Sequence, residues 1–236
     1  ALHNWPDLPQ GEMGIKSGPI MASGITFDII VQGKGGHAAL PHSTIDPVPI
    51  ACFIVTQLQS LVSRRINPLD AAVLTVGKIE AGSSPNIIPA EARISGTCRT
   101  LTDETQLLLL EGIKRISRYV AEAHDAQAEV IIHGEGYPNT TNHPEQANFM
   151  ASVMCEMVGE DKANTNVLPA MTAEDFGFML KEVPGAYGWI GNGNSNISGG
   201  ELHSTTYDFN DQNLQLGAYF WEKLARQWFL TEAKKS

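Results

Sequence analysis

The sequence predicts an α/β protein in which one complete βαββαβ unit is inserted into a second α/β domain that is only partly represented. Between residues 25 and 135, segments with period-two apolar alternation are interspersed with segments that have apolar residues at helical spacing. Their order is strand, helix, strand, strand, helix, strand, which is the ferredoxin-like pattern. Residues 1–24 and 136–236 supply mostly helices and too few strands for a sheet of their own.

The first half of the unit begins with a strand at residues 25–32. A Gly-rich turn, "GKGGHAALPH", follows it. Asp46 and Pro47 are residue types suited to the N-cap and the first helical position. The helix behind them is predicted by apolar residues at helical spacing up to Arg64 and Arg65, namely Ile50, Ile54, Leu58 and Leu61.

The second half of the unit holds strands at "AAVLTVGKIE" and "EARISGTCRT". In the latter, Ala92, Ile94 and Cys98 face one way and the intervening polar residues face the other. Thr102 or Asp103 can cap a second helix, whose expected apolar stripe is Leu107, Leu110, Ile113, Ile116 and Val120. The segment "QAEVIIHGE" is the last strand.

The flanks are expected to lack a complete core. Residues 1–24 predict a loop and one strand, and a helix follows Tyr137 with Ala147, Met150 and Met154 on one face. An acid-rich helix at "TAEDFGFMLKE" and a strand at "GAYGWIG" come next. The last helix starts near Asn210 or Asp211, with a stripe of Leu214, Trp221, Leu224 and Trp228. We therefore expect the chain to begin in the middle of a domain.

Composition excludes several classes of partner. The 236 residues are 42% hydrophobic and carry a net charge of −10, with 16 basic against 26 acidic residues and no basic cluster. Nucleic acids and anionic membrane surfaces are therefore not expected partners. No apolar run approaches the roughly 20 residues of a membrane span, and no signal peptide is evident. The scattered Cys52, Cys98 and Cys155 predict reduced, buried thiols in a cytoplasmic protein.

Two of the seven histidines lie in segments that could place an imidazole at the end of a structural element. His3 occurs in "ALHNWP" and His203 in "ELHSTTYDF". Both could bind zinc, but a catalytic zinc site needs about three protein ligands, and no HxxxH, CxxC or HxH supplies the rest. His124, His133 and His143 are expected to be surface or capping residues.

Four other features have both a structural and a functional interpretation. Gly35 and Gly36 before His37 allow either a positive-φ bulge or a close approach to a ligand. Asn86 in "SSPNIIP" is either a turn residue or a ligand contact. Arg99 is either a solvated charge or a carboxylate clamp. Glu174 and Asp175 are expected in the first turn of a helix, where acids complement the helix dipole, rather than in catalysis.

Five stretches together resemble the M20 metallopeptidase family, and in particular its N-acyl-amino-acid amidohydrolases, which include the hippurate and auxin-conjugate hydrolases. The stretches are "LHNWPDLPQGEMGIKSGPIMAS", "GKGGHAALPHSTIDPV", "GSSPNIIPAEARISGTCRT", "MTAEDFGFML" and "LHSTTYDFND". The resemblance implies that His3 and His203 bind metal, that His37 stabilises the oxyanion across a dimer, and that Asn86 and Arg99 hold the substrate carboxylate. It assigns no clear role to His42.

The same resemblance implies a domain organisation. Residues 1–24 and 136–236 would belong to a catalytic α/β domain with two divalent metal ions (Zn, or alternatively Mn, Co or Ni). Residues 25–135 would be an inserted lid that mediates homodimerisation. The family's Cys/His ligand motif and its pair of glutamates, which provide a further ligand and the general base, would precede Ala1. The chain is thus expected to be an inactive fragment of an enzyme that cleaves hippurate-like N-acyl amino acids.

The sequence is also compatible with two alternatives. One is a non-catalytic fragment that dimerises or binds acyl-amino acids. The other is an unrelated ferredoxin-like regulatory domain with a helical appendage, against which the set of motifs argues.

Overall fold

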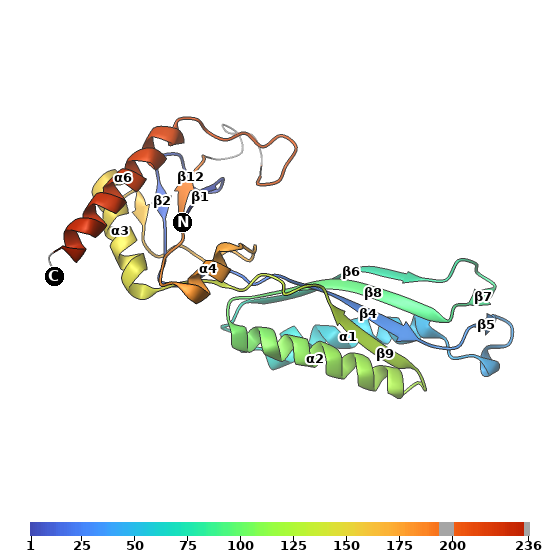
Figure 1. The fold of residues 1–236 in the computed structure, drawn as a ribbon. Coiled ribbons are helices and arrows are strands. Elements are labelled where there is room, and N and C mark those ends of the chain that lie inside the picture. The colour runs from blue at the N-terminus through green and yellow to red at the C-terminus, as the bar shows by residue number, and fades with distance from the viewer. Residues whose placement is uncertain (194–200, 234–236) are drawn as a thin grey trace. The chain divides into compact units, whose positions relative to one another are not determined.

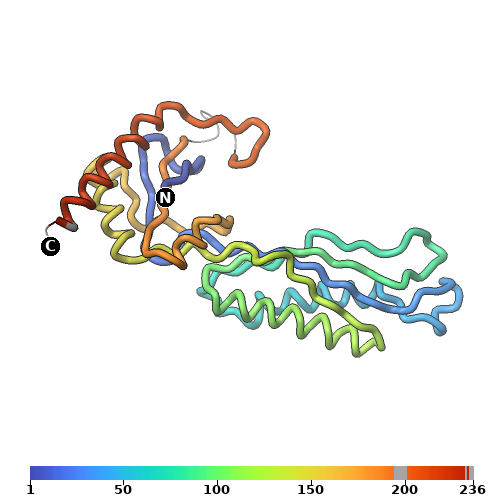
Figure 2. Tube along the Cα trace, in the orientation of Figure 1, coloured from blue at the N-terminus to red at the C-terminus, as the bar shows by residue number. Residues whose placement is uncertain are grey.

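The computed structural model describes residues 1–193 and 201–233, and the chain divides into two compact units. Met21–Asn139 together with Ala170–Glu174 form what we call the inserted unit. Ala1–Ile20, Thr140–Pro169 and Asp175–Ser236 form the terminal unit. Figure 2 shows that the terminal unit combines the first segments of the chain, in blue, with segments from its C-terminal part, in orange and red. The predicted fold class, an α/β protein with an inserted unit, is confirmed.

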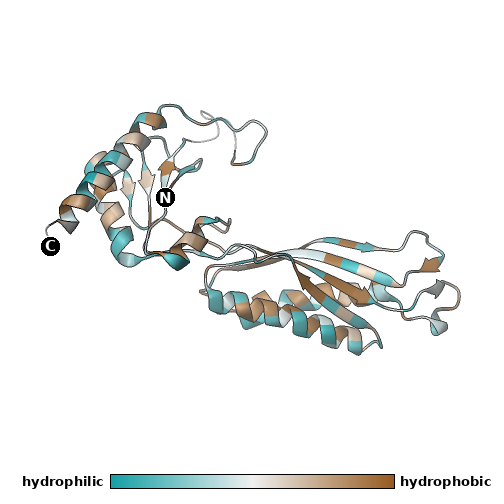
Figure 3. Ribbon diagram, viewed as in Figure 1, coloured by the Kyte–Doolittle hydropathy of each residue, from teal (hydrophilic) through white to brown (hydrophobic). Residues whose placement is uncertain are grey.

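The inserted unit contains a four-stranded antiparallel sheet with two helices on one face (Figure 1). Its strand order is β6-β8-β4-β9. The strands are β4 (Ile25–Gln32), β6 (Ala72–Ala81), β8 (Glu91–Thr100) and β9 (Gln127–Ile132), and the helices are α1 (Pro47–Arg65) and α2 (Asp103–Glu122). This is the βαββαβ order that the sequence predicts. The apolar side chains of the sheet and helices meet in one core. Figure 3 shows hydrophobic residues, in brown, on both the strands and the helices of this unit.

Helix α1 begins as its sequence predicts. The carboxylate of Asp46 accepts a hydrogen bond from the backbone N–H of Val48 at 3.0 Å, and Pro47 occupies the first turn. An N-cap of this kind is worth about 1 kcal/mol. The four predicted core residues of the helix are all buried, with 3% or less of their surface exposed: Ile50, Ile54, Leu58 and Leu61.

Helix α2 is rotated relative to its predicted apolar stripe. Thr102 is the N-cap and accepts a hydrogen bond from the N–H of Thr105 at 3.2 Å. Leu107, expected in the core, is 61% exposed, whereas Leu109 is fully buried. Because leucine occupies all four positions from 107 to 110, the sequence allows several faces of the helix to be the buried one. Packing against α1 determines which face is buried. Gly112 of α2 lies against Leu61 of α1, where a Cβ would collide with the leucine side chain.

A short two-stranded ribbon extends from the inserted unit. It pairs β5 (Gly36–His37) with β7 (Ile87–Ile88) in antiparallel register, His37 opposite Ile87. The 3-10 helix η1 (Pro41–Ser43) follows β5. The glycines before His37 are not among the positive-φ residues, which excludes the positive-φ bulge, one of the two interpretations that their sequence allows. Their absent side chains allow close packing instead, because a Cβ at Gly35 would lie 2.9 Å from the carbonyl oxygen of Ile88.

The terminal unit is built on a mixed sheet of short strands in the order β1-β12-β2-β11. These strands are β1 (Leu2–Trp5), β2 (Met13–Gly14), β11 (Ala163–Asn164) and β12 (Gly188–Gly191). A second ribbon pairs β3 (Gly18–Met21) with β10 (Thr140–Asn142). The first 24 residues thus contain three strands rather than the one expected. Strands of two to four residues are too short to show a period-two pattern.

Helices α3 (Pro144–Val158), α4 (Phe176–Glu182) and α6 (Asn213–Glu232) complete the terminal unit. The predicted face of α3 is correct, with Ala147, Met150 and Met154 buried. Helix α4 begins at Phe176, so Glu174 lies outside it, contrary to expectation.

The predicted stripe of α6 is mostly wrong. Leu214 and Trp221 are 62% and 47% exposed, and fully buried Phe220 makes the core contact. Aromatic and apolar residues of this helix lie on all of its sides, so its sequence does not define a single apolar face. The helix packs on α3, where the rings of Trp228 and Phe149 lie 5.2 Å apart.

Within the described residues, no helix combines the length and the apolar character needed to cross a bilayer.

Candidate functional site

His3 lies on β1, which is held in place by parallel pairing with β12, His3 standing opposite Trp189. Its Nδ1 is 2.6 Å from the carbonyl oxygen of Asn4. A carbonyl can only accept, so Nδ1 carries the proton and donates it. The lone pair of the neutral ring is therefore on Nε2, and an N–H donated to a backbone carbonyl is the usual arrangement on the other nitrogen of a metal-binding histidine.

His203 lies in an exposed turn of the same unit, and its backbone has a φ of 65°. This left-handed conformation is uncommon for a residue with a side chain and costs on the order of 1 kcal/mol or more unless its surroundings hold it. Ser204 and Thr206 make local hydrogen bonds that shape the turn, with the N–H of Ser204 donating to the carbonyl of Glu201 at 3.1 Å.

The loop that carries His203, residues 201–210, is fastened to the sheet at two points. The side-chain amide of Asn4 donates a hydrogen bond to the hydroxyl of Tyr207. Asn192, fully buried at the end of β12, donates to the carbonyl of Asp208 at 3.1 Å and accepts from the N–H of Asn210 at 2.8 Å. Burial raises the pKa of the Tyr207 phenol above its usual value, so it stays a neutral hydroxyl at physiological pH.

The structure therefore fastens the segment that bears His203 to the strand that bears His3. Two imidazoles are fewer than the three or so protein ligands of a catalytic zinc site. Within residues 1–193 and 201–233 no group of three or more His, Cys, Asp or Glu side chains could hold a metal ion. The donor chemistry of His3 fits a metal, but the described ligand set is incomplete.

The cysteines add no ligand to this pair. Burial raises the pKa of the Cys98 thiol to about 11, so at neutral pH it is protonated in the core of the inserted unit. Cys155 is partly buried on α3. Cys52 is exposed on α1, which corrects the expectation that all three thiols are buried. Its place on a helix face that points away from the core could not be read from its apolar neighbours.

His37 and Asn86 meet on the ribbon of the inserted unit. The N–H of Ala38 donates to the carbonyl of Asn86 at 3.1 Å, and both side chains are exposed. The Nδ1 of His37 accepts a hydrogen bond from the N–H of Ala39 at 3.0 Å. Neutral His37 therefore carries its proton on Nε2, opposite in tautomer to His3, and presents a hydrogen-bond donor. The hydroxyl of Ser84 donates to the Oδ1 of Asn86 at 2.5 Å, which fixes the orientation of the amide.

Arg99 lies at the other end of the inserted unit. It is the penultimate residue of β8, and its guanidinium lies against Gly24, where a Cβ would collide with Nη1. Glu91, at the start of β8, is eight residues away, about 26 Å at roughly 3.3 Å per residue. The ribbon with His37 adjoins the Glu91 end of β8. One chain therefore does not bring Arg99 together with His37 and Asn86.

A further polar cluster was not predicted. Asp28 on β4 is buried and accepts from Nη1 of Arg93 at 3.0 Å and from Nε2 of His133 at 2.9 Å. A hydrogen bond from Ser95, followed by the contacts with His133 and Arg93, lowers the pKa of Asp28 below its usual 3.8. His133, expected to be a surface histidine, is half exposed but paired. Cross-strand pairing of β4 with β8 and β9 is what unites these residues, and no local motif signals it.

Comparison with known proteins gives a family match for most of the inserted unit. Residues 23–125 match the peptidase dimerisation domain of the M20 family. Over 216 residues the chain is 37% identical to an N-acetyldiaminopimelate deacetylase of Pediococcus pentosaceus, covering 92% of this chain and 55% of that protein. It is 33% identical over 226 residues to an N-acetylcysteine deacetylase of Bacillus subtilis, covering 95% and 57%.

A solved structure agrees with these matches. The crystal structure of a dinuclear metal-binding M20 peptidase from Bacillus subtilis superposes with a TM-score of 0.76 at 27% identity, over 95% of this chain and 55% of that one. The chain belongs to the M20 family, and it spans a little over half the length of the relatives that it matches.

Proposed function

We propose that this chain is the C-terminal part of a metal-dependent amidohydrolase that cleaves the amide bond of N-acyl amino acids. In this proposal residues 1–24 and 136–236 belong to the catalytic domain and residues 25–135 form the lid. The proposal is carried by the hydrogen-bond contacts of two histidine rings, which assign them opposite tautomers: a lone pair on Nε2 of His3 and an Nε2–H donor on His37. The names of the deacetylase relatives support the reaction class.

His3 and His203 are the residues of this chain that would hold divalent metal. When bound, a pair of such ions polarises the scissile carbonyl and lowers the pKa of a bound water. A binuclear centre is supported by the related peptidase described as dinuclear metal-binding. Zinc is the ion we propose first, because imidazole suits it, and Mn, Co and Ni are the alternatives.

His37 would act on the transition state. An exposed Nε2–H on a two-residue strand can donate to the oxygen that gains negative charge as the carbonyl becomes tetrahedral. Its backbone is fixed by pairing with β7 and its ring by Ala39, so little reorganisation is needed. Asn86 offers an exposed amide beside it, and Arg99 a cation suited to a carboxylate.

The distance between Arg99 and His37 leads us to propose that two copies of the chain complete each site. In this arrangement His37 and Asn86 of one copy serve the metal-bearing face of the other. The match to a dimerisation domain supports it.

The surface that we propose for self-association is α1 with the edge strand β6. From Pro47 to Ser63 helix α1 contains no Asp, Glu, Lys or Arg, although its outward face exposes Val48 at 40% and Phe53 at 49%. Interface centres are depleted of charge in this way. The exposed face of α2, in contrast, carries many charges: Glu104, Glu111, Lys114, Arg115, Arg118 and Glu122. Strand β6, at the sheet edge beneath α1, can extend the sheet into a second copy.

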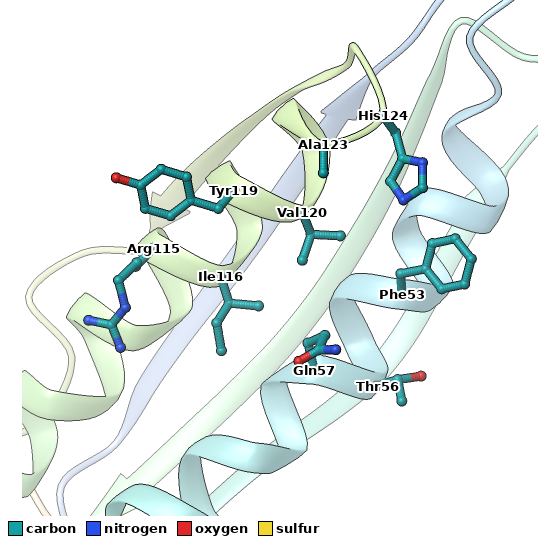
Figure 4. Close-up of a pocket in the computed structure, with 9 residues that line it drawn as sticks. All are labelled: Phe53, Thr56, Gln57, Arg115, Ile116, Tyr119, Val120, Ala123 and His124. Carbon is teal, nitrogen blue, oxygen red and sulfur yellow. The ribbon is translucent and has the colours of Figure 1, made fainter.

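A groove of about 540 Å³ between α1 and α2 borders this surface. Figure 4 shows Phe53 beside His124 at one end of the groove, and their stacked rings lie 5.3 Å apart. Phe53 is half exposed, and its ring is positioned by His124. Ordered aromatic side chains of this kind often contribute a large part of the binding free energy of an interface.

The acyl group is a finer proposal. The relatives' names support N-acetyl substrates, and hippurate-like N-benzoyl substrates remain the prediction made from the sequence. The test measures amine release by the complete enzyme, meaning this chain with the N-terminal segment that we expect to precede it. N-acetyl and N-benzoyl amino acids are compared with each metal. Metal-dependent turnover that His3→Ala and His203→Ala both abolish is expected, and turnover that survives chelation contradicts the proposal.

The chain alone is expected to be inactive and to bind Zn²⁺ weakly, because two imidazoles leave most coordination positions to water. Isothermal titration should find no submicromolar site. A tight site lost in both His3→Ala and His203→Ala would show that this chain retains a complete set of ligands. The alternative, a non-catalytic fragment that dimerises or binds acyl-amino acids, is favoured if the complete enzyme never turns over.

A further inference from the structure

The hydrogen bond between Asn4 and Tyr207 joins two segments more than 200 residues apart in sequence. Asn4 directly follows His3 on β1, and Tyr207 lies four residues after His203 in the loop. Successive side chains of a strand point to opposite faces, so the amide of Asn4 holds the loop without occupying the face of His3. The carbonyl of the same residue accepts from Nδ1 of His3. Asn4 therefore contacts both histidine-bearing segments.

The second anchor of the loop is Asn192, the residue directly after β12. Its side chain is fully buried, and both its amide and its carbonyl are engaged by the loop, at Asp208 and Asn210. His203 has a left-handed backbone, which persists only when the surrounding structure determines it. Local bonds around Ser204 shape the turn, and among the described residues the two anchors tie the loop to β1 and to the end of β12.

We propose that Asn4 and Tyr207 are positioning residues for the metal site: their hydrogen bond holds the His203 loop against the His3 strand, so that both imidazoles are in place before a divalent ion binds. The proposal rests on the proposed function, since it requires that both histidines bind metal. Neither residue contacts the ion. Their contribution is to the preorganisation of a ligand, and groups that support metal ligands in this way typically change metal affinity by 10–100-fold.

The test is a Co²⁺ titration of the metal-free complete enzyme, followed by the visible absorption of bound cobalt. Tyr207→Phe removes only the hydroxyl, and Asn4→Ala removes its partner. Tyr219→Phe, a matched change at a tyrosine that is 54% exposed on α6, is the control. We expect each test variant to weaken the binding of one of two cobalt ions about tenfold. The double variant should be no weaker than either single one, because both remove the same bond.

Thermal unfolding of the metal-free proteins separates positioning from stability. A positioning role predicts that Tyr207→Phe leaves the metal-free melting temperature close to that of Tyr219→Phe while its cobalt affinity falls. Unchanged cobalt affinity, additive losses in the double variant, or a loss that follows lowered metal-free stability would each overturn the proposal. Failure of the proposed function looks different: there the wild type binds no cobalt, or His3→Ala and His203→Ala bind it as well as wild type, and the positioning proposal falls with it.

Discussion

Replacing His37 by alanine removes one hydrogen-bond donor from an exposed ribbon and disturbs little else. The side chain is exposed, and the only hydrogen bond described for its ring is the one accepted from the N–H of Ala39, which water can replace. We therefore expect the free energy of unfolding to change by less than about 0.5 kcal/mol, as for other surface substitutions. The effect on catalysis should be much larger, because Nε2–H is the group that we propose meets the oxyanion.

The magnitude follows from the role. Loss of one oxyanion donor costs about 2.7–4 kcal/mol, which corresponds to roughly 10²–10³ in kcat. Because the contact forms in the transition state rather than with bound substrate, kcat and kcat/KM should fall by similar factors.

Steady-state kinetics on an N-acyl amino acid measures both constants. His42→Ala is the matched control, since His42 is also exposed and lies five residues away in η1, and it should leave kcat within about twofold of wild type. An unchanged kcat in His37→Ala, or an equal loss in His42→Ala, would refute the reasoning and leave His37 as a turn residue.

Three other outcomes are expected. Arg99→Ala should raise KM with little change in kcat, because a carboxylate clamp holds substrate and transition state about equally; a large fall in kcat alone would contradict it. Asp28, whose pKa is lowered in the folded state, stabilises the fold above its usual value of 3.8, and this stabilisation is lost as pH falls through the lowered value. Melting temperatures measured from pH 5 downward should thus fall less steeply for Asp28→Asn than for wild type; parallel curves would exclude this role. Phe53→Glu should shift sedimentation toward monomer while Leu107→Glu, on α2, should not; identical behaviour would exclude the α1 surface.

The sequence predicts the bounds and the buried face of a helix correctly where its apolar residues form one long stripe on a single side. Helix α1 combines a cap at Asp46, Pro47 in the first turn and apolar residues at a single phase, and its bounds and buried face are as predicted. Helix α2 has equally clear bounds, but four consecutive leucines leave its rotation open until it packs on α1, where Gly112 lies against Leu61. Helix α6 is ambiguous for the same reason, since apolar and aromatic residues occur on every side.

The candidate site was predictable in part. Both metal-ligand candidates were identified from short motifs and from the family resemblance, which do not depend on tertiary structure. The tautomers of His3 and His37 were not predictable, because each depends on one backbone contact. The contact of Asn4 with Tyr207 has no local signal, because it joins the two ends of the chain. The separation of Arg99 from His37 has no local signal either, because it depends on β8 running as one continuous strand between the two ends of the inserted unit.

We propose that two copies of this chain share each active site, and a mixed dimer tests this proposal most directly. One subunit carries His37→Ala and the other His203→Ala, with different affinity tags so that only the heterodimer of the complete enzyme is recovered. One of its two sites would then contain both an intact His203 and a His37 donated by the other subunit. We predict roughly half of the wild-type kcat per dimer, far above either homodimeric parent, as two-fold symmetry requires. A heterodimer no more active than its parents would contradict the account.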